Sequence, residues 1–119
     1  MEHFFAKLRV SFQQDARPFF GPGVCELLER TKETGSIRAA SMQMNMAYSK
    51  ALRIVKEAER SLGFPLLQSN IGGAGGGGSC LTERGEWIIG QYRRMQSALQ
   101  EEADKLLQQY FFSFEKGWV

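Results

Sequence analysis

A run of glycines in the second half of the chain restricts the available folds more than any other feature. Six of the seven residues from Gly72 to Gly78 are glycine, and Ala74 is the exception. Ordering glycine costs more backbone entropy than ordering any other residue, so such a run suits a flexible loop or a backbone that approaches a ligand closely. The flanking stretches 64–69 and 80–82 can both form short strands, with Pro65 at the start of the first.

Three interpretations fit a glycine run of this kind. An interdomain linker agrees with the composition, but a helical pattern resumes at Glu83, directly after the second flank. A phosphate-binding loop would end in Gly-Lys-Ser/Thr and lead from a buried strand straight into a helix, and this run does neither. We favour the wing of a winged helix-turn-helix, in which a loop joins two short strands, and the linker remains the alternative.

The composition is that of one small folded domain with an accessory element. Of the 119 residues, 43% are hydrophobic and 24% are charged, which are ordinary values for a globular protein. The formal net charge of +2 and the pI near 8.7 permit nucleic-acid binding without requiring it.

Cysteine, histidine and hydropathy patterns argue against several classes of protein. Cys25 and Cys80 stand alone and His3 is the single histidine, so no standard zinc pattern forms, and we expect neither a metal nor a cofactor. Both thiols fit side chains in a reducing compartment. We see no secretory signal and no apolar run near the roughly 20 residues of a membrane span, so we expect a cytoplasmic chain without membrane contact.

The N-terminal segment alternates between apolar and polar residues. In residues 4–12 the even-numbered side chains are all apolar, and Lys7, Arg9 and Ser11 lie on the opposite face. A period of two predicts a half-buried strand over 4–12, followed by turns in residues 13–20.

Apolar residues then recur at helical spacing in three successive stretches. Helices are predicted over Pro22 to about Thr34, Ile37 to about Met44 and about Tyr48 to Leu62. Gly35 suits the position just past the first helix, Ser36 can cap the second, and Asn45 tolerates the left-handed conformation in the connection to the third. A short helix, a tight turn and a longer helix together predict a helix-turn-helix.

A last helix is predicted from Glu83 to about Phe112, with Thr82 as its N-cap. At ~1.5 Å per residue it would be roughly 40 Å long, which exceeds the width of so small a domain. Its apolar stripe therefore predicts a homodimer, although a helix folded back on its own domain would also cover the stripe. The residues predicted for dimerisation are Ile88, Tyr92, Met95, Leu99, Leu106 and Tyr110, and an aromatic tail, 111–119, follows.

Five motifs between residues 21 and 85 carry a family resemblance. They are Gly21-Pro22-Gly23, Thr34-Gly35-Ser36-Ile37 with Ala39-Ala40, Met46-Ala47-Tyr48-Ser49-Lys50-Ala51, the glycine run, and Leu81-Thr82-Glu83-Arg84-Gly85. In this order and spacing the chain resembles the N-terminal DNA-binding domain of the ModE family, the molybdate-responsive repressors of the winged-helix class. The Thr-Gly-Ser helix start alone is shared with the wider LysR-type class.

The resemblance implies an α+β fold with two parts. Residues 1–82 would form a winged helix-turn-helix with an N-terminal strand, and residues 83–119 would form the dimerisation helix and the tail. The function implied is a DNA-binding transcriptional regulator that acts as a homodimer, and not an enzyme. The recognition helix, about 47–62, would enter the major groove of double-stranded DNA, and the wing, 70–79, would follow the backbone. The predicted DNA-binding residues are Ser36, Arg38, Ala47, Tyr48, Ser49, Lys50, Arg53, Lys56, Gly73, Gly75 and Gly76.

The chain also departs from the family pattern. Full-length members add ligand-binding domains that hold molybdate, and we expect a chain of 119 residues to be the stand-alone form, without a molybdate-binding domain. Gln68-Ser69, Ala74 and Ser49-Lys50 stand where the family usually has more charged residues. Each lost cation removes a phosphate contact, so the sequence predicts weaker DNA binding than the family norm.

Other functions remain as alternatives. A winged-helix protein-interaction module that has lost strong DNA binding also fits the missing wing cations. An enzyme is poorly supported, because no paired carboxylates, core histidine or nucleophile motif stands out. A redox switch at Cys25 or Cys80 would require an exposed thiol with a lowered pKa.

Overall fold

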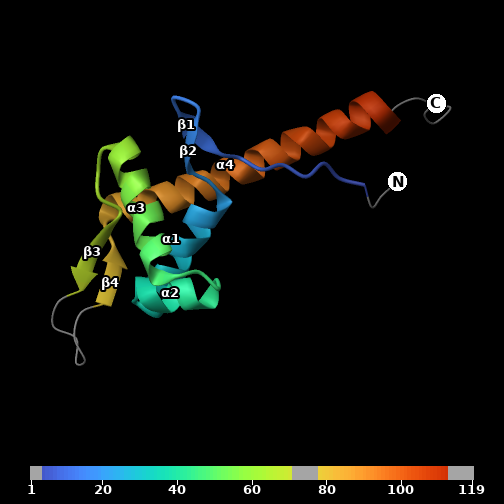
Figure 1. Ribbon diagram of the computed structural model, residues 1–119. Coiled ribbons are helices and arrows are strands. Elements are labelled where there is room, and N and C mark those ends of the chain that lie inside the picture. The colour runs from blue at the N-terminus through green and yellow to red at the C-terminus, as the bar shows by residue number, and fades with distance from the viewer. Residues whose placement is uncertain (1–3, 71–77, 113–119) are drawn as a thin grey trace.

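The structure, a computed structural model, describes residues 4–70 and 78–112. Its elements are β1 (Phe12–Gln14), β2 (Arg17–Phe20), α1 (Pro22–Thr34), α2 (Ile37–Gln43), α3 (Tyr48–Leu62), β3 (Leu67–Asn70), β4 (Gly78–Leu81) and α4 (Glu83–Leu107), followed by a π-helical turn (Gln108–Phe112). Helices α1 to α3 form a bundle, the β3–β4 pair projects from it, and α4 packs on the bundle before it extends away (Figure 1). The predicted class, an α+β winged helix-turn-helix with a long C-terminal helix, is confirmed.

The three helices of the bundle lie where the sequence predicts them, because local signals fix their ends. Gly35 and Gly63 have φ values of 79° and 86°, so each ends its helix in the left-handed conformation that glycine adopts without strain. Ser36 Oγ accepts a hydrogen bond from the Ala39 N–H and caps α2. Asn45, between α2 and α3, has a φ of 54°, as expected for this tight connection.

The predicted N-terminal strand over 4–12 is wrong. Residues 4–11 pair with no strand in the described parts of the chain, and the first strands are β1 and β2, which form an antiparallel hairpin in the region predicted as turns. The hairpin turn, Asp15-Ala16, has positive φ at both residues, as a two-residue type I′ turn requires. The alternating pattern thus predicted an extended segment correctly, but it did not identify the element against which that segment packs.

That element is α4, along which the N-terminal segment runs (Figure 1). Gln100 Nε2 donates a hydrogen bond to the Ala6 carbonyl, and Tyr92 Oη donates one to the Val10 carbonyl. Side-chain donors on a helix therefore satisfy carbonyls that a neighbouring strand would otherwise satisfy.

The strands β3 and β4 form an antiparallel pair whose register runs from Leu67 opposite Leu81 to Asn70 opposite Gly78. Because the glycine run connects two paired strands, the linker interpretation is wrong and the wing interpretation holds. The first strand begins later than predicted, so Pro65 precedes it. Residues 71–77, with the predicted contact residues Gly73, Gly75 and Gly76, lie outside the described residues.

The core draws on the bundle, the hairpin, β4 and the first turns of α4. Leu27 and Leu28 of α1 are fully buried, and Tyr92 of α4 is buried beside the hairpin. The Tyr92 ring meets the rings of Phe12 and Phe20 edge-on, with centroids 5.6 and 5.3 Å apart. Side chains on both sides of the predicted division at residues 82 and 83 therefore share one core.

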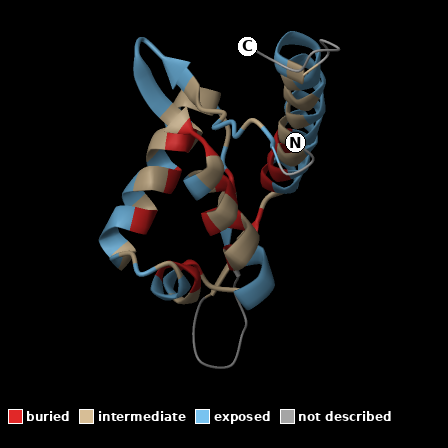
Figure 2. Cartoon of the chain, turned by 90° about the vertical axis from the view of Figure 1, so that its right-hand side faces the viewer, coloured by how far each residue is buried: buried red, intermediate tan, exposed pale blue. Residues whose placement is uncertain are grey.

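Beyond Tyr92, α4 leaves the bundle, and most of its residues there are exposed (Figure 2). Met95, Leu99, Leu106 and Tyr110 of the predicted stripe are between 38% and 62% exposed. No described helix, α4 included, has the length and apolar character needed to cross a membrane.

Candidate nucleic-acid interface

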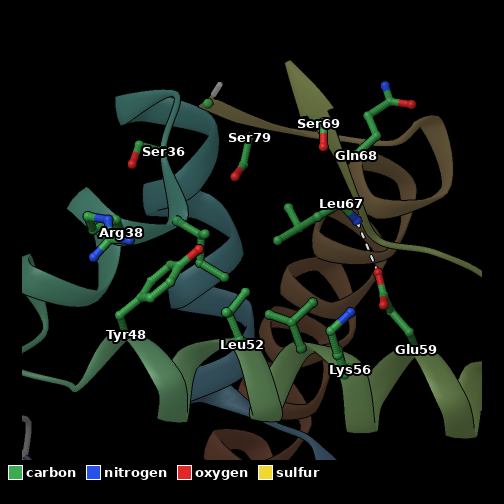
Figure 3. Close-up of a pocket in the computed structure, with 13 residues that line it drawn as sticks. Ser36, Arg38, Tyr48, Leu52, Lys56, Glu59, Leu67, Gln68, Ser69 and Ser79 are labelled. Atoms are coloured by element: carbon green, nitrogen blue, oxygen red, sulfur yellow. Dashed lines mark hydrogen bonds between the residues drawn. The ribbon is translucent and has the colours of Figure 1, made fainter. Parts of the chain in front are cut away.

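An open groove of about 430 Å³ lies between α3 and the two wing strands (Figure 3). Helix α3 forms one wall, β3 and β4 form the other, and the start of α2 lies at one end. Hydroxyl, amide and cationic groups combine there with an apolar floor. The polar lining consists of Ser36, Arg38, Tyr48, Lys56, Glu59, Gln68, Ser69 and Ser79.

Helical geometry decides which side chains of α3 line this groove. Tyr48, Leu52 and Lys56 are four residues apart, so they form a stripe along one side of the helix. Figure 3 shows all three pointing from α3 toward the wing strands. Lys56 is exposed and forms no ion pair with a described residue, so its ammonium group is available to an anion.

Arg38 reaches the same groove from α2. Its Cζ lies 4.0 Å from the centroid of the Tyr48 ring, which is within the range of a cation–π contact. In the described parts of the chain no carboxylate pairs with this guanidinium. Its N–H donors therefore remain available to a ligand in the groove.

Glu59, also on the groove side of α3, holds the wing in place. Its Oε2 accepts hydrogen bonds from the backbone N–H groups of Leu66 and Leu67, at 2.7 and 3.3 Å. On the second strand, the Ser79 N–H donates to the Gly35 carbonyl at 2.9 Å. Both wing strands are thus tied to the helical bundle, and the fold itself sets the width of the groove.

The remaining predicted contact residues of α3 lie outside the groove lining. Lys50 is exposed and follows Tyr48 by about 200° around the helix, so it points away from the groove. Arg53 is exposed, and its Nη1 lies 3.8 Å from Glu57 Oε2. The groove thus collects Ser36, Arg38, Tyr48 and Lys56, whereas Ala47, Ser49, Lys50 and Arg53 are exposed outside its lining.

Sequence reasoning missed the wall that the wing strands provide. Gln68, Ser69 and Ser79 line the groove, although the sequence analysis had placed the wing contacts in the glycine loop. The spacing of Tyr48, Leu52 and Lys56 was a usable signal, but the wing residues become visible only from the register of the strands.

Cys25 does not have the properties of a redox switch. The side chain is fully buried, and burial raises the pKa of its thiol to about 12, so it remains protonated at neutral pH. Glu29, one turn further along α1, accepts hydrogen bonds from Arg93 Nε and Nη2 at 2.9 and 2.7 Å. These bonds lower the pKa of Glu29 and join α1 to α4.

The fold and the groove together define a class of protein. A helix-turn-helix followed by a strand pair beside its second helix is a winged helix-turn-helix. The family model for the bacterial regulatory helix-turn-helix proteins of the lysR family matches residues 24–86, which is more than half of the chain. The chain therefore belongs to this family.

Curated relatives confirm the resemblance to ModE. The chain is 36% identical to the molybdenum-pterin-binding protein MopB of Rhodobacter capsulatus over 91 residues, which are 76% of this chain and 31% of MopB. It is 31% identical to the transcriptional regulator ModE of Haemophilus influenzae over 101 residues, 85% of this chain and 38% of that protein. With the molybdenum transport protein ModE of Azotobacter vinelandii, identity is 29% over 98 residues, 82% of this chain and 36% of the relative. The chain thus spans between 31% and 38% of the length of these relatives.

Proposed function

We propose that the chain binds double-stranded DNA as a homodimer and regulates transcription in the cytoplasm. Helix α3 enters the major groove, and the wing, 70–79, follows the phosphate backbone of the same duplex. The observation that carries this proposal is the groove between α3 and the wing, into which Arg38, Tyr48 and Lys56 project. The Glu59 carboxylate in the same groove is engaged by two backbone N–H groups, as expected for a wing support.

The charge of this face fits a polyanion. Arg38 and Lys56 form no ion pair within the described residues, whereas Arg30, Lys32 and Arg93 elsewhere on the molecule all pair with glutamates. A cation that neutralises a phosphate releases condensed counterions, so binding through this face will weaken steeply as salt rises.

The dimer is supported by apolar side chains that the chain leaves uncovered. Exposed large apolar residues gather on the outer part of α4 and on the N-terminal segment beside it, where Phe4 meets Phe112 edge-on at 5.4 Å. A second copy would cover both stretches, because they lie side by side (Figure 1). The residues concerned are Phe4, Phe5, Leu8, Met95, Leu99, Leu106, Tyr110 and Phe111. Ile88 and Tyr92 are already buried in their own core, so we omit them from the proposed interface.

The experiment that tests the DNA-binding proposal is a selection from random-sequence duplexes, followed by affinity measurements across a salt series. We expect enrichment of a two-fold symmetric site and an affinity that falls at least tenfold between about 50 and about 200 mM salt. Lys56→Ala is expected to reduce the slope of log affinity against log salt by about 1, as for one lost phosphate contact.

Lys50→Ala is the matched control, because Lys50 is an exposed lysine on the same helix that points away from the groove. We expect its affinity to stay within about twofold of the wild type. A larger loss for Lys50→Ala than for Lys56→Ala would place the DNA on another face of α3. If the wild-type protein binds no duplex even at low salt, the proposal is wrong, and a protein-interaction module becomes the better description.

A further inference from the structure

We propose that Arg38 and Tyr48 act as one DNA-contacting unit, an inference that rests on the proposed DNA binding. The Tyr48 ring holds the Arg38 guanidinium so that its paired N–H donors engage a paired acceptor on the duplex. Two parts of DNA offer such an acceptor, namely the two free oxygens of a backbone phosphate and the O6 and N7 atoms of guanine.

The contact with the Tyr48 ring does not use up the donors of the Arg38 guanidinium. Arg38 Cζ lies 4.0 Å from the centroid of the Tyr48 ring. A guanidinium carries five N–H donors in one plane, so a single aromatic ring cannot occupy all of them, and donors remain for a ligand. Figure 3 shows Arg38 and Tyr48 side by side at the end of the groove, from α2 and α3 respectively.

The stability of the fold does not account for Arg38. The residue is exposed and lies in the first turn of α2, where the helix dipole disfavours a cation. The guanidinium groups of Arg30 and Arg93, by contrast, each bridge to a glutamate. The Arg38 guanidinium instead lies over the ring of Tyr48, which is the first residue of α3.

The ring matters because an exposed arginine samples many rotamers. Ordering a free arginine on binding costs conformational entropy, which offsets part of the energy of the new hydrogen bonds. A guanidinium that is already stacked has lost part of this freedom before DNA arrives. Removal of the Tyr48 ring should therefore weaken the contribution of Arg38, even though the Arg38 side chain itself is unchanged.

A double-mutant cycle tests this coupling with two probes, a duplex selected by the wild-type protein and a random-sequence duplex. Arg38→Lys keeps the charge but removes the planar pair of N–H donors, which we call the fork. We expect this variant to bind the selected duplex about tenfold more weakly. Tyr48→Leu removes the ring, and we expect a loss of similar size. The double variant should be weaker than either single variant by no more than about twofold, because both changes remove the same contact. Tyr48→Phe keeps the ring and should keep the coupling.

The two probes distinguish the acceptors. If the fork binds a phosphate, Arg38→Lys weakens both duplexes alike, since a phosphate is present in every sequence. If the fork binds guanine, the loss is confined to the selected duplex, and substitution of one guanine in that duplex reproduces it. Either result supports the unit.

Arg84→Lys is the matched control, because Arg84 Cζ lies over the Phe64 ring at 4.8 Å but does not line the groove. We expect this variant to bind both duplexes as the wild type does. Thermal melting of every variant separates a purely structural role, which would lower the melting temperature in step with affinity, from the proposed one.

Losses that multiply in the double variant, or an Arg38→Lys variant that binds like the wild type, would overturn the inference while DNA binding itself stands. A wild-type protein that binds neither duplex at low salt would overturn the proposed function, and this inference with it. The two failures are therefore distinguishable.

Discussion

The two halves of helix α4 differ in burial: the first half packs into the core, and the second half is exposed. Its first turns place Ile88, Ile89 and Tyr92 in the core, where they are at most 9% exposed. Further along the same helix, Leu99 and Leu106 are both 38% exposed, and the neighbouring N-terminal segment is exposed as well (Figure 2). One apolar stripe thus runs along the whole helix. Its first part packs against the bundle, and its second part packs against no described element of comparable size.

This contrast shows that an apolar stripe predicts burial but does not identify the element that covers it. The spacing of the stripe is the same in both regions, since the pitch of the helix does not change. What differs is the element that lies opposite. The inner part therefore contributes to the stability of one chain, and the outer part, on the proposed function, contributes to association of two.

The largest expected effect is on stability, and it comes from replacing a leucine by alanine once in the core and once on the exposed half of α4. Leu28→Ala removes a fully buried side chain from the core and should lower the free energy of unfolding by about 3 kcal/mol. Leu99→Ala should cost less than about 0.5 kcal/mol in the dilute, monomeric chain, because Leu99 is already exposed there. Chemical denaturation at several protein concentrations measures both. Equal losses in the dilute chain would show that the outer part of α4 is buried within a single chain.

A second effect concerns association alone. Leu99→Asp with Leu106→Asp places two carboxylates on the exposed stripe, and we expect the dissociation constant of the dimer to rise at least tenfold, or about 1.4 kcal/mol. Sedimentation equilibrium measures the change. Ser97→Asp is the control, because Ser97 is an exposed residue of the same helix outside the stripe. A wild-type chain that stays monomeric at high concentration would remove the distinction between the two regions.

A third, smaller effect comes from the ion pair where the two regions meet. Arg93 lowers the pKa of Glu29 below its ordinary value of 4.5, so the folded chain holds this proton less tightly than the unfolded chain does. The stabilisation is therefore complete above about pH 4.5 and is lost as the pH falls through the lowered value. Because both side chains are more than a third exposed, solvent screens the pair, and we expect about 0.5 to 1 kcal/mol at pH 7.

Urea denaturation of the wild type and Glu29→Gln across pH 3 to 7 measures this contribution. The difference between the two proteins should shrink toward acid. Glu26→Gln is the control, since Glu26 pairs with Arg30 within α1 alone and should change stability by about 0.5 kcal/mol or less. A difference that grows toward acid pH would contradict the assigned direction of the pKa shift.

The smallest effect is one of reactivity and leaves stability unchanged. Cys25 lies in the core with a thiol pKa of about 12, whereas Cys80 is half-buried at the base of the wing. Titration with a thiol reagent near pH 8 should therefore modify Cys80 and spare Cys25 until denaturant is added. The Cys80→Ser variant should show no reactive thiol in the folded state. Rapid modification of Cys25 in that variant would mean that the core opens readily.

Much of the fold could be predicted because its signals are local. Helix ends are fixed by backbone conformation or by a hydrogen bond to a near neighbour, at Gly35, Ser36, Asn45 and Gly63. The helices end and begin at or beside these residues as the sequence predicts. The strand over 4–12 failed for the complementary reason. Its alternation describes only one segment, and a strand also requires a second segment that lies far away in the sequence.

The candidate site was predicted in part. Ser36, Arg38, Tyr48 and Lys56 are among the residues that the family resemblance implies, and all four line the groove. The wing wall, the support from Glu59 and the stack of Arg38 on Tyr48 were not predicted, because each depends on how separate elements pack.

By itself, the sequence determined the three helices of the bundle, their caps, the position of the wing and the existence of a long apolar stripe on the last helix. These features follow from φ preferences, periodicity and hydrogen bonds between neighbours. The tertiary structure decided which half of that stripe belongs to the core, which lysine of α3 lines the groove and which arginine stacks on Tyr48. Such choices arise only when helices and strands pack, since packing alone brings residues that are distant in the chain to within a few ångströms of one another.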